Sequence, residues 1–186
     1  MIGYAFCGSF CTFSSSFKEL ERLVSLGYNV LPIMSETAYK TDTRFQKSKE
    51  FVAKLTSTTK KPIIHTIKTA EPLGPQINLD ALIISPCTGN TLAKIANGIT
   101  DTAVCMAAKA HLRSDRPLII ALASNDAMSA NLKNIAALLQ KKNVFFVPMK
   151  QDDIEKKPHS LVADFSLLVD TLTEALSGKQ IRPLFK

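Results

Sequence analysis

The chain has no long hydrophobic run, and this restricts where it works. None of its apolar stretches reaches the roughly 20 residues that a membrane-spanning helix needs. The N-terminus carries no basic segment before its apolar residues, which argues against a secretory signal. We therefore expect a cytoplasmic protein without membrane contact. For 186 residues, a single domain is the simplest organisation.

Cysteine is sparse and lacks the spacing of a redox or metal motif. The four cysteines stand at positions 7, 11, 87 and 105, and no two of them form a C-x-x-C pair. No metal-ligand spacing is present either. We expect reduced thiols, with a small buried role for Cys7 and Cys11 and a core position for Cys105.

The usual nucleotide and nucleic-acid motifs are also missing. The chain contains neither a G-x-G-x-x-G fingerprint nor a Walker A lysine, and it lacks zinc-finger spacing and an aromatic RNA-binding pattern. A net charge of +7 on its own would favour nucleic acid. However, the lysines are scattered and mixed with acidic residues, as on solvated faces. We expect no nucleic-acid partner, because an anionic substrate or a phosphate-bearing cofactor explains the basic excess more simply.

The chain does have a regular alternation of strand and helix patterns. Apolar runs predict strands at 2–6, 28–33, 63–64, 81–84, 118–122 and 144–147. Helical spacing predicts helices at 17–24, 44–56, 92–96, 102–112, 129–141 and 161–176. This alternation predicts the α/β class: a flavodoxin-like (Rossmann-like) doubly wound parallel sheet. We expect one domain over 1–186, with loops at 70–79 and 149–160 and a C-terminal tail at 177–186.

Residues 85–101 form the most informative segment. They read S-P-C-T-G-N-T-L-A-K-I-A-N-G-I-T-D and directly follow the apolar strand 81–84. We expect this strand to stop at Pro86, which cannot donate to a ladder, and the next helix to stop at Gly98. Open α/β sheets hold ligands at such strand-to-helix loops. The polar side chains of a small-molecule site would then be Thr88, Asn90 and Thr91.

Two further turns with hydroxyl groups follow predicted strands. Gly8 and Ser9, with Thr12 close behind, come after the first strand, and S-E-T-A at 35–38 comes after the second. Free N–H groups and hydroxyls at a helix start make a phosphate site. Ordinary helix caps explain the same residues, because serine and threonine are common N-caps. Two such turns at adjacent strand ends favour a bound phosphomonoester.

The segment P-C-T-G-N-T-L-A-K-I-A-N-G-I-T-D at 86–101 resembles the P-A-S-A-N-T…K-I-A-x-G-I-x-D block of FMN-dependent flavoproteins. That family includes the phosphopantothenoylcysteine decarboxylases and the peptide-cysteine decarboxylases. Residues 8–9 resemble its first phosphate loop, residues 35–38 its S/T-x-x-A turn, and A-S-N-D-A-M at 123–128 its P-A-M-N-x-x-M loop. The resemblance implies bound FMN. The cofactor-binding residues that it implies are Gly8, Ser9, Thr12, Ser35, Ala38, Pro86, Cys87, Thr88, Ser124 and Asn125.

Further segments are similar to one branch of this family, the B subunits of dipicolinate synthases. They are I-H-T-I at 64–67, A-E-P-L-G-P at 70–75, Q-D-D at 151–153 and K-K-P-H-S-L-V-A at 156–163. The resemblance implies work in the mother cell of a sporulating bacterium. There, this chain and a separate A subunit that binds NADP or NAD would oxidise a dihydrodipicolinate-type dicarboxylate to dipicolinate. It also implies a homo-oligomer, either a trimer or a multiple of trimers.

The chain departs from the decarboxylases of the family at several positions. Ser124 stands where they carry methionine, and no tryptophan is present for the Met-Trp pair that follows there. T-D-T at 100–102 replaces their Cys-Asp-Asn. We therefore expect the cofactor site to persist more faithfully than the decarboxylation chemistry.

Two residues are candidates for catalytic roles. Asn90 lies at a predicted helix start, where a cap is the simple interpretation, but its position in the family favours a ligand contact. His65 is either a pocket acid or base, since imidazole titrates near neutral pH, or a packed histidine bonded to a loop carbonyl. We expect His111 and His159 on the surface and Cys87 beside the flavin.

Three functions therefore remain open. In the first, the chain is one component of a flavin-dependent oxidoreductase and holds a dicarboxylate near Asn90. In the second, it is a non-catalytic assembly component that keeps only the fold. In the third, it is an FMN-dependent decarboxylase of a cysteine-containing substrate.

Overall fold

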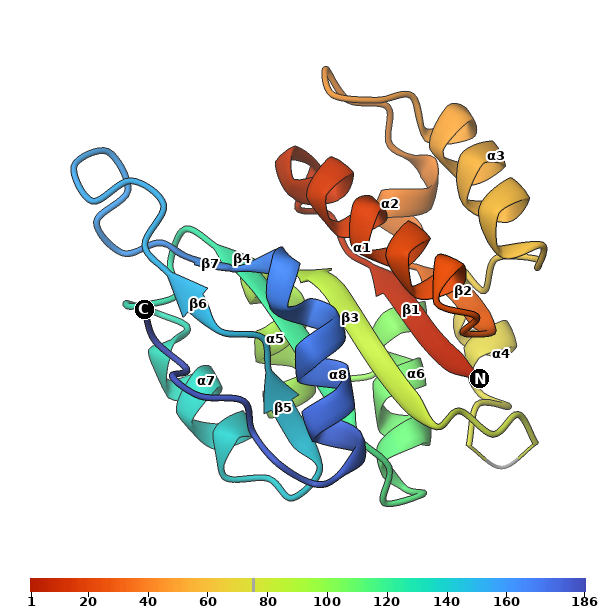
Figure 1. The fold of residues 1–186 in the computed structure, drawn as a ribbon. Helices are drawn as coiled ribbons and strands as arrows, with labels where there is room; N and C mark the ends of the chain where they lie inside the picture. Colours follow the sequence, from red (N-terminus) through yellow and green to blue (C-terminus); the bar gives the residue numbers. More distant parts are fainter. Residues whose placement is uncertain (75) are drawn as a thin grey trace.

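The computed structural model describes residues 1–74 and 76–186, and these form one sheet between two layers of helices (Figure 1). The strands are β1 (Ile2–Phe6), β2 (Val30–Met34), β3 (Ala81–Cys87), β4 (Leu118–Ser124), β5 (Val144–Phe146), β6 (Met149–Lys150) and β7 (Leu161–Ala163). The helices are α1 (Phe13–Ser25), α2 (Glu36–Lys40), α3 (Ser48–Thr59), α4 (Ile67–Ala70), α5 (Gly89–Ala96), α6 (Ala103–Leu112), α7 (Leu132–Leu139) and α8 (Leu168–Leu176). Two short 3-10 turns, η1 (Phe10–Thr12) and η2 (Phe165–Leu167), precede α1 and α8.

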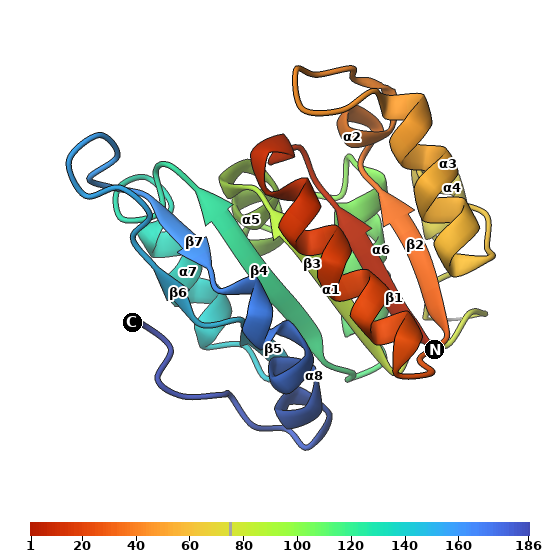
Figure 2. The ribbon, with the colours of Figure 1, turned by 45° about the horizontal axis from the view of Figure 1, so that its top comes forward.

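The sheet has the predicted parallel, doubly wound arrangement. Strands β2, β1, β3, β4 and β5 lie side by side in that order, and every pairing among them is parallel (Figure 2). The chain winds outward from β1 to β2 and then returns to β3 on the other side of β1. The winding direction therefore reverses between β1 and β3, and such a switch point opens a crevice at the carboxyl ends of the strands.

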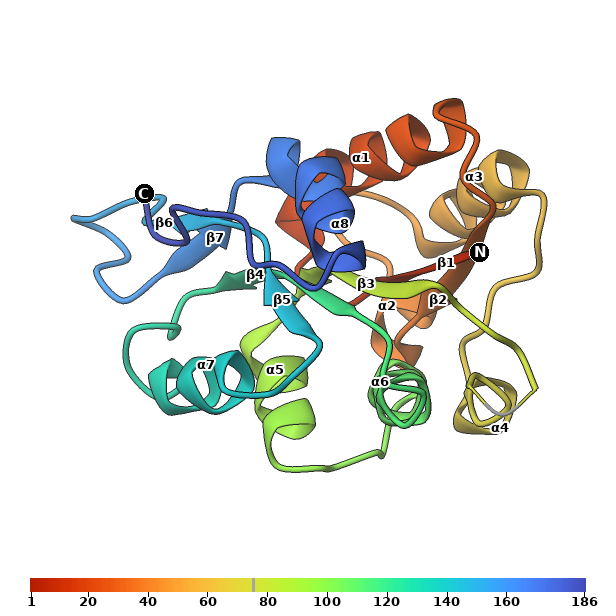
Figure 3. The ribbon, with the colours of Figure 1, turned by 60° about the horizontal axis from the view of Figure 1, so that its bottom comes forward.

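Alternation along the strands divides the core into two clusters. Ile2, Tyr4 and Phe6 of β1 pack with α1, α3 and α8, whereas Ala5 faces the cluster that contains α4 to α7. Figure 3 shows these two helical layers above and below the sheet. Because both faces of the central strands are covered, all residues of β3 and β4 are buried. This explains the continuous apolar runs in the sequence.

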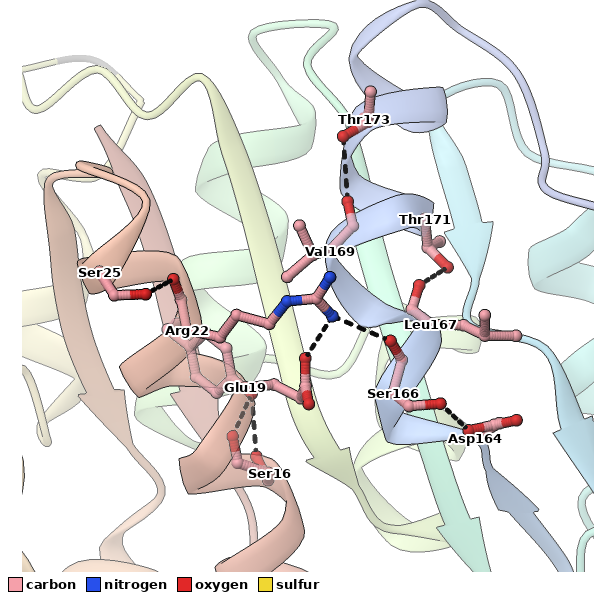
Figure 4. Close-up of polar contacts among 11 residues, drawn as sticks. Ser16, Glu19, Arg22, Ser25, Asp164, Ser166, Leu167, Val169, Thr171 and Thr173 are labelled. Atoms are coloured by element: carbon pink, nitrogen blue, oxygen red, sulfur yellow. Dashed lines mark hydrogen bonds and ion pairs between the residues drawn. The ribbon is translucent and has the colours of Figure 1, made fainter.

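Polar contacts fix helix α1 to the rest of its layer. Arg22 donates from Nη1 to Glu19 Oε2 at 3.4 Å and to the carbonyl of Ser166 at 3.2 Å, and so joins α1 to η2 (Figure 4). On the buried side of α1, the Tyr4 hydroxyl donates to the carbonyl of Ser16 at 2.7 Å, and the Ser16 hydroxyl donates to the carbonyl of Ser85 at 2.6 Å. Burial raises the pKa of Tyr4, so its hydroxyl stays protonated.

The predicted end of the third long strand was wrong. Strand β3 does not stop at Pro86 but runs to Cys87, with a register shift between Ile84 and Cys87. Proline lacks only the donor; its carbonyl accepts a hydrogen bond from the Cys7 amide at 3.2 Å. A local bulge thus accommodates the missing N–H and keeps the strand next to β1. Gly98, with φ of +72°, does lie just beyond the helix that follows.

The segment after β5 differs most from the prediction. The predicted loop 149–160 begins with β6, and the predicted helix 161–176 is divided into β7, η2 and α8. Strand β7 pairs antiparallel with the end of β4 and with β6, so tertiary pairing overrides the local helical pattern. The predicted tail 177–186 is anchored, because Gln180 bonds the backbone N–H and C=O of Phe146.

Several other boundaries shift by a few residues. Predicted strand 28–33 is β2 at 30–34, predicted helices 44–56 and 129–141 are α3 and α7, and residues 63–64 contribute only a single bridge from Ile64 to Ile33. The predicted loop 70–79 includes Pro75, which lies outside the described residues. His111 was predicted on the surface but is fully buried, with Nε2 2.9 Å from the carbonyl of Pro117. Among the described residues, no helix has the length and apolar character needed to cross a bilayer.

Candidate functional site

The carboxyl ends of the first three strands meet at one edge of the sheet. The Cys7 amide, just after β1, donates to the carbonyl of Pro86 in β3, and the Ser35 amide, just after β2, donates to that of Phe6 at 2.9 Å. A Cβ atom added at Gly8 would contact the Thr37 methyl group at 3.8 Å, so the loops after β1 and β2 touch. The predicted phosphate turns therefore lie next to each other.

A cleft of about 410 Å³ opens at this edge, between the loop after β1 and the end of β4. This volume is within the range of small-molecule sites, roughly 300–1,000 Å³. The structure brings four of the predicted cofactor residues together on its walls: Ser9, Thr12, Ser124 and Asn125. The long loop after β6 closes the far side with Asp152 and Lys157. Lys157 Nζ lies 2.9 Å from Asp152 Oδ2, and this bond raises the pKa of the lysine.

The first turn presents hydroxyls and does not act as an ordinary helix cap. The side chain of Ser9 forms no cap bond to η1, and that of Thr12 forms none to α1. Instead, the Thr12 hydroxyl donates to the carbonyl of Ser9 at 2.9 Å and lies 3.2 Å from its Oγ. The capping interpretation therefore does not account for Ser9, which lies at the wall of the cleft.

The second turn is a helix cap. Ser35 is the N-cap of α2, and its Oγ accepts the Ala38 amide at 3.2 Å. Ala38 itself is buried. In the same helix, both oxygens of Glu36 accept the Ala103 amide, at 3.1 and 3.3 Å, so α2 supplies a carboxylate to the N-terminus of α6. A negative charge is favourable at that helix end.

The loop after β3 exposes fewer groups than predicted. Pro86 and Cys87 are buried, and Thr88 caps α5 by accepting the Thr91 amide at 3.2 Å. Burial, with the nearby thiols of Cys7 and Cys105, raises the pKa of Cys87 well above that of a free thiol. Cys7 is buried as expected, but Cys11 is exposed. The Cys87 side chain is thus part of the buried core at the end of β3, and its thiol stays protonated.

The loop after β4 is held by a polar network that includes Ser124. The Ser124 hydroxyl donates to Asp126 Oδ1, and Asn131 donates from Nδ2 to the other oxygen at 2.9 Å. Asn134 in turn donates to Asn131 Oδ1 at 2.9 Å. The bond from Ser124 lowers the pKa of Asp126, partial burial opposes this, and the bond from Asn131 lowers it further. The network fixes the Ser124 hydroxyl at the wall of the cleft.

Helix α5 approaches this network so closely that its first residue must be glycine. A Cβ atom at Gly89 would overlap Ser124 Oγ and would lie 2.6 Å from Asn131 Nδ2 and 2.8 Å from Asp126 Oδ1. These distances are shorter than van der Waals contact. The hydrogen bonds of the network can therefore form as observed only while residue 89 has no side chain.

The two predicted catalytic residues lie on different elements. Asn90 is exposed in the first turn of α5, and the cap there is Thr88, so the capping interpretation of Asn90 does not hold. His65 is half-buried and stacks on Tyr39 of α2, with ring centroids 3.7 Å apart. Among the residues that the structure describes, no hydrogen bond or shared pocket links His65 with Asn90. Their roles stay predictions.

Comparison with known proteins now identifies the family. The model of the family described as Flavoprotein matches residues 2–177. The chain belongs to the flavoprotein family. It is 42% identical to the B subunit of dipicolinate synthase of Bacillus subtilis, over 98% of this chain and 92% of that protein. It is 32% identical to the flavin prenyltransferase UbiX of Chlamydia muridarum, over 70% of this chain and 69% of that protein.

Solved structures of the flavoprotein family agree with this assignment. The B subunit of dipicolinate synthase from Bacillus halodurans C superposes with a TM-score of 0.91 and 40% identity, covering 100% of this chain and 95% of that one. A phosphopantothenoylcysteine decarboxylase variant (PPC decarboxylase) gives a TM-score of 0.63 at 20% identity, over 92% and 95% of the two chains. The second similarity concerns the fold alone.

Sequence reasoning missed three parts of this candidate site. Lys157 and Asp152 reach the cleft only because β6 and β7 return the chain to the end of β4, and no local signal in the sequence marks that pairing. Asp126 lies within the predicted loop at 123–128, directly after the predicted cofactor residues Ser124 and Asn125, but was given no role. Glu36 was within the predicted turn, but its bond to α6 joins residues 67 apart in sequence.

Proposed function

We propose that this chain is the FMN-binding B subunit of a dipicolinate synthase. It would act with a nicotinamide-dependent A subunit, which uses NADP or NAD, and oxidise a dihydrodipicolinate-type precursor to dipicolinate. The observation that carries the proposal is the 42% identity to the Bacillus subtilis protein over 98% of the chain. The proposed setting is the cytoplasm of a sporulating mother cell.

The donor set of the cleft fits the phosphate and ribityl groups of FMN. Ser9 and Thr12 offer hydroxyls, Asn125 offers an amide, and Lys157 offers a positive charge at the opposite wall. Hydroxyls and backbone N–H groups at the carboxyl ends of strands are the usual phosphate ligands of such folds. A bound flavin would supply a ring that accepts a hydride. A structural relative named AnUbiX is described in complex with FMN and dimethylallyl pyrophosphate, which supports FMN as the cofactor.

The residues of this chain would bind and orient a dicarboxylate. The Asn90 amide has two N–H donors and carries no charge, so it suits a carboxylate without adding a buried cation. It is exposed in the first turn of α5, where the helix N-terminus also favours an anion. The Ser124 hydroxyl donates its one hydrogen to Asp126, so its oxygen would face the cleft as an acceptor for an N–H or O–H group of the ligand. A homo-oligomer, as a trimer or a multiple of trimers, is also proposed, and a related decarboxylase from Escherichia coli O157:H7 is described as dodecameric.

Visible absorbance and flavin titration of the purified chain test the cofactor. Formation of the aromatic pyridine product, followed by ultraviolet absorbance with the dehydrogenase partner, precursor and nicotinamide present, tests the reaction. We expect the pair to form product and the isolated partner to form much less. Equal rates with and without this chain would refute the proposal. An active pair without flavin would favour an assembly role, whereas release of carbon dioxide from a cysteine-ended peptide would favour a decarboxylase.

Asn90→Asp is the sharpest variant for the substrate site. It keeps the shape of the side chain but replaces donors with an anion, so it should repel a dicarboxylate and lower turnover roughly tenfold or more. Asn90→Ala is the matched control, because it removes the same donors without adding charge. The aspartate variant should be slower than the alanine variant at saturating flavin. Wild-type rates in both would remove Asn90 from the site and leave the family assignment intact.

A further inference from the structure

A second hollow lies on the face of the molecule that α5 and α6 cover. It has a volume of about 310 Å³ and is lined by the end of α5, the turn after it and α6. Figure 3 shows that these two helices lie in the same layer. Its floor is apolar and includes Ile95, Cys105 and Leu112, and Ile99 at its edge is 47% exposed. We call this hollow the α5–α6 groove. Large apolar side chains at an exposed rim are typical of a surface that another molecule covers.

The rim of the α5–α6 groove is positively charged. Lys109 and Arg113 line the groove from α6, four residues apart and therefore on the same side of the helix. Neither of these two cations forms an ion pair among the described residues, whereas Asp101 is already paired with Lys94 of α5 at 2.9 Å. The groove thus selects an occupant with an apolar centre and negative charge beside it.

The chain carries such a feature on another part of its surface. Ile154 is 69% exposed, the highest value among the large hydrophobic residues that the structure shows as exposed. Asp153 and Glu155 flank it directly. The positive charges that follow are Lys156, beyond Glu155, and Lys157, which is paired with Asp152. We call residues 153–155 the loop tip.

The loop tip is held in shape before any contact forms. The Lys157 amide donates to the carbonyl of Asp153 at 2.9 Å, and the Lys156 amide donates to Asp153 Oδ1 at 2.9 Å. These bonds close a turn with Ile154 at its end. A pre-formed turn loses little conformational entropy on binding, which favours association. Figure 1 shows the loop between β6 and β7 projecting from one end of the molecule, away from α6.

We propose that the loop tip of one copy of this chain inserts into the α5–α6 groove of a second copy. Ile154 would fill the apolar floor, and Asp153 and Glu155 would face Lys109 and Arg113. The contact joins two different surfaces, so each copy offers both a loop tip and a groove, and a closed ring satisfies all of them. This inference rests on the homo-oligomer proposed above and names the two surfaces that would meet in it, but it does not depend on the proposed reaction.

The contact would make the ligand cleft sensitive to assembly. The loop that carries the tip also places Asp152 and Lys157 on the wall of the cleft that contains Ser9 and Ser124. Insertion of the tip into a neighbouring copy fixes this loop at its outer end. The cleft wall that this loop forms would therefore be held more firmly in the assembly than in the single chain.

Sedimentation velocity across micromolar concentrations tests the contact. Wild-type chain should associate, and Ile154→Asp should lose the largest assembly, with its dissociation constant raised about tenfold or more, as for removal of a buried anchor. Leu132→Ser is the matched control, since Leu132 is 50% exposed on α7, outside both surfaces. Circular dichroism and thermal unfolding check that each variant folds. A monomeric wild type, or an Ile154→Asp variant that assembles as wild type does, overturns the proposal.

Charge reversal separates this contact from other ways of associating. Lys109→Glu with Arg113→Glu should weaken assembly, Asp153→Lys with Glu155→Lys should do the same, and all four changes together should restore it. Lys133→Glu, on exposed α7, controls for net charge. With the exposed Cys11 replaced by serine, Ile99→Cys mixed with Ile154→Cys should form a disulfide between copies on mild oxidation, and much less should form with either variant alone. Failure of the four-fold variant to recover, together with no disulfide, refutes the proposal. Groove variants that assemble normally but no longer bind the dehydrogenase partner would also overturn it and would assign the groove to that partner.

Discussion

Replacement of Gly89 by alanine tests the tightest feature of the candidate site. The new Cβ would overlap Ser124 Oγ and would lie 2.6 Å from Asn131 Nδ2 and 2.8 Å from Asp126 Oδ1. None of these atoms is the free end of a long side chain, because each one is held by another bond of the network. Either α5 moves away from the end of β4 or the network opens.

Both responses lower the free energy of unfolding, and the contacts give the size of the loss. Overpacking of a well-packed site costs about 1–3 kcal/mol. If the network opens instead, hydrogen bonds to the charged Asp126 are lost, each worth about 1.5–3 kcal/mol before solvent screening reduces it. Alanine favours a helix over glycine by up to about 1 kcal/mol, which offsets part of the loss. We expect a net destabilisation of about 1–3 kcal/mol, which corresponds to a fall in Tm of about 2–4 °C for each kcal/mol in a chain of this size.

Denaturant unfolding of the wild type, Gly89→Ala, Ser124→Ala and the double variant measures this cost. Ser124→Ala removes the atom that the new Cβ overlaps, so the double variant should lose less than the sum of the two single losses. A coupling of about 1 kcal/mol or more is expected for groups in contact. The reasoning is refuted if Gly89→Ala is as stable as the wild type. It is also refuted if the two changes are strictly additive.

Three further predictions concern the phosphate turn, the network and the helix contact. Ser9→Asp should weaken FMN binding about tenfold or more, since like charges about 4 Å apart repel by roughly 1–4 kcal/mol, while Ser9→Ala should weaken it far less. Flavin titration of the folded variants measures both affinities, and an unchanged affinity in Ser9→Asp would exclude Ser9 from the phosphate site. Folding lowers the pKa of Asp126, so the ionised carboxylate stabilises the folded state fully above the unfolded-state pKa, and this contribution is lost as the pH falls through the folded-state pKa. The difference in free energy of unfolding between the wild type and Asp126→Asn should therefore shrink on acidification, and a difference that widens in acid would contradict this. Glu36→Ala should destabilise the chain by about 0.5–2 kcal/mol in denaturant titrations, because the α6 amide loses its carboxylate partner. Glu36→Gln keeps a neutral acceptor and should lose less, and a Glu36→Ala variant as stable as the wild type would refute the contribution of this contact.

Much of the fold could be predicted from the sequence because its strands are buried on both faces. Short continuous apolar runs such as 2–6 and 118–122 are typical of strands buried on both faces, and both are strands. The elements that were misjudged depend on distant partners. Strand β7 forms only because the end of β4 offers free edge groups to Leu161 and Val162, a fact that no local pattern of 161–176 contains.

The residues of the candidate site also fall into those that a local motif predicts and those that depend on distant parts of the chain. Ser9, Thr12, Ser124 and Asn125 were predicted from motif positions at strand ends, and the topology does bring them to one cleft. Lys157 was quoted only as part of a segment similar to the family and was given no role in the site. It reaches the cleft because strands β6 and β7 pair and bring the loop between them to the end of β4. His111 was misjudged, since burial of a polar ring requires a partner such as the Pro117 carbonyl, which only the folded chain provides.

Two departures of this chain from the family pattern form one structural unit. The P-A-S-A-N-T and P-A-M-N patterns have alanine at the position of Gly89 and methionine at that of Ser124. In this chain, the Ser124 hydroxyl and Asp126 occupy the space that an alanine Cβ at position 89 would take. The small residue in α5 therefore permits the polar network at the end of β4, and the network in turn replaces an apolar side chain at the cleft wall with a fixed hydroxyl. A fixed hydroxyl oxygen discriminates between polar ligand groups more strongly than an apolar surface does, because an aligned acceptor that is buried without a donor costs free energy.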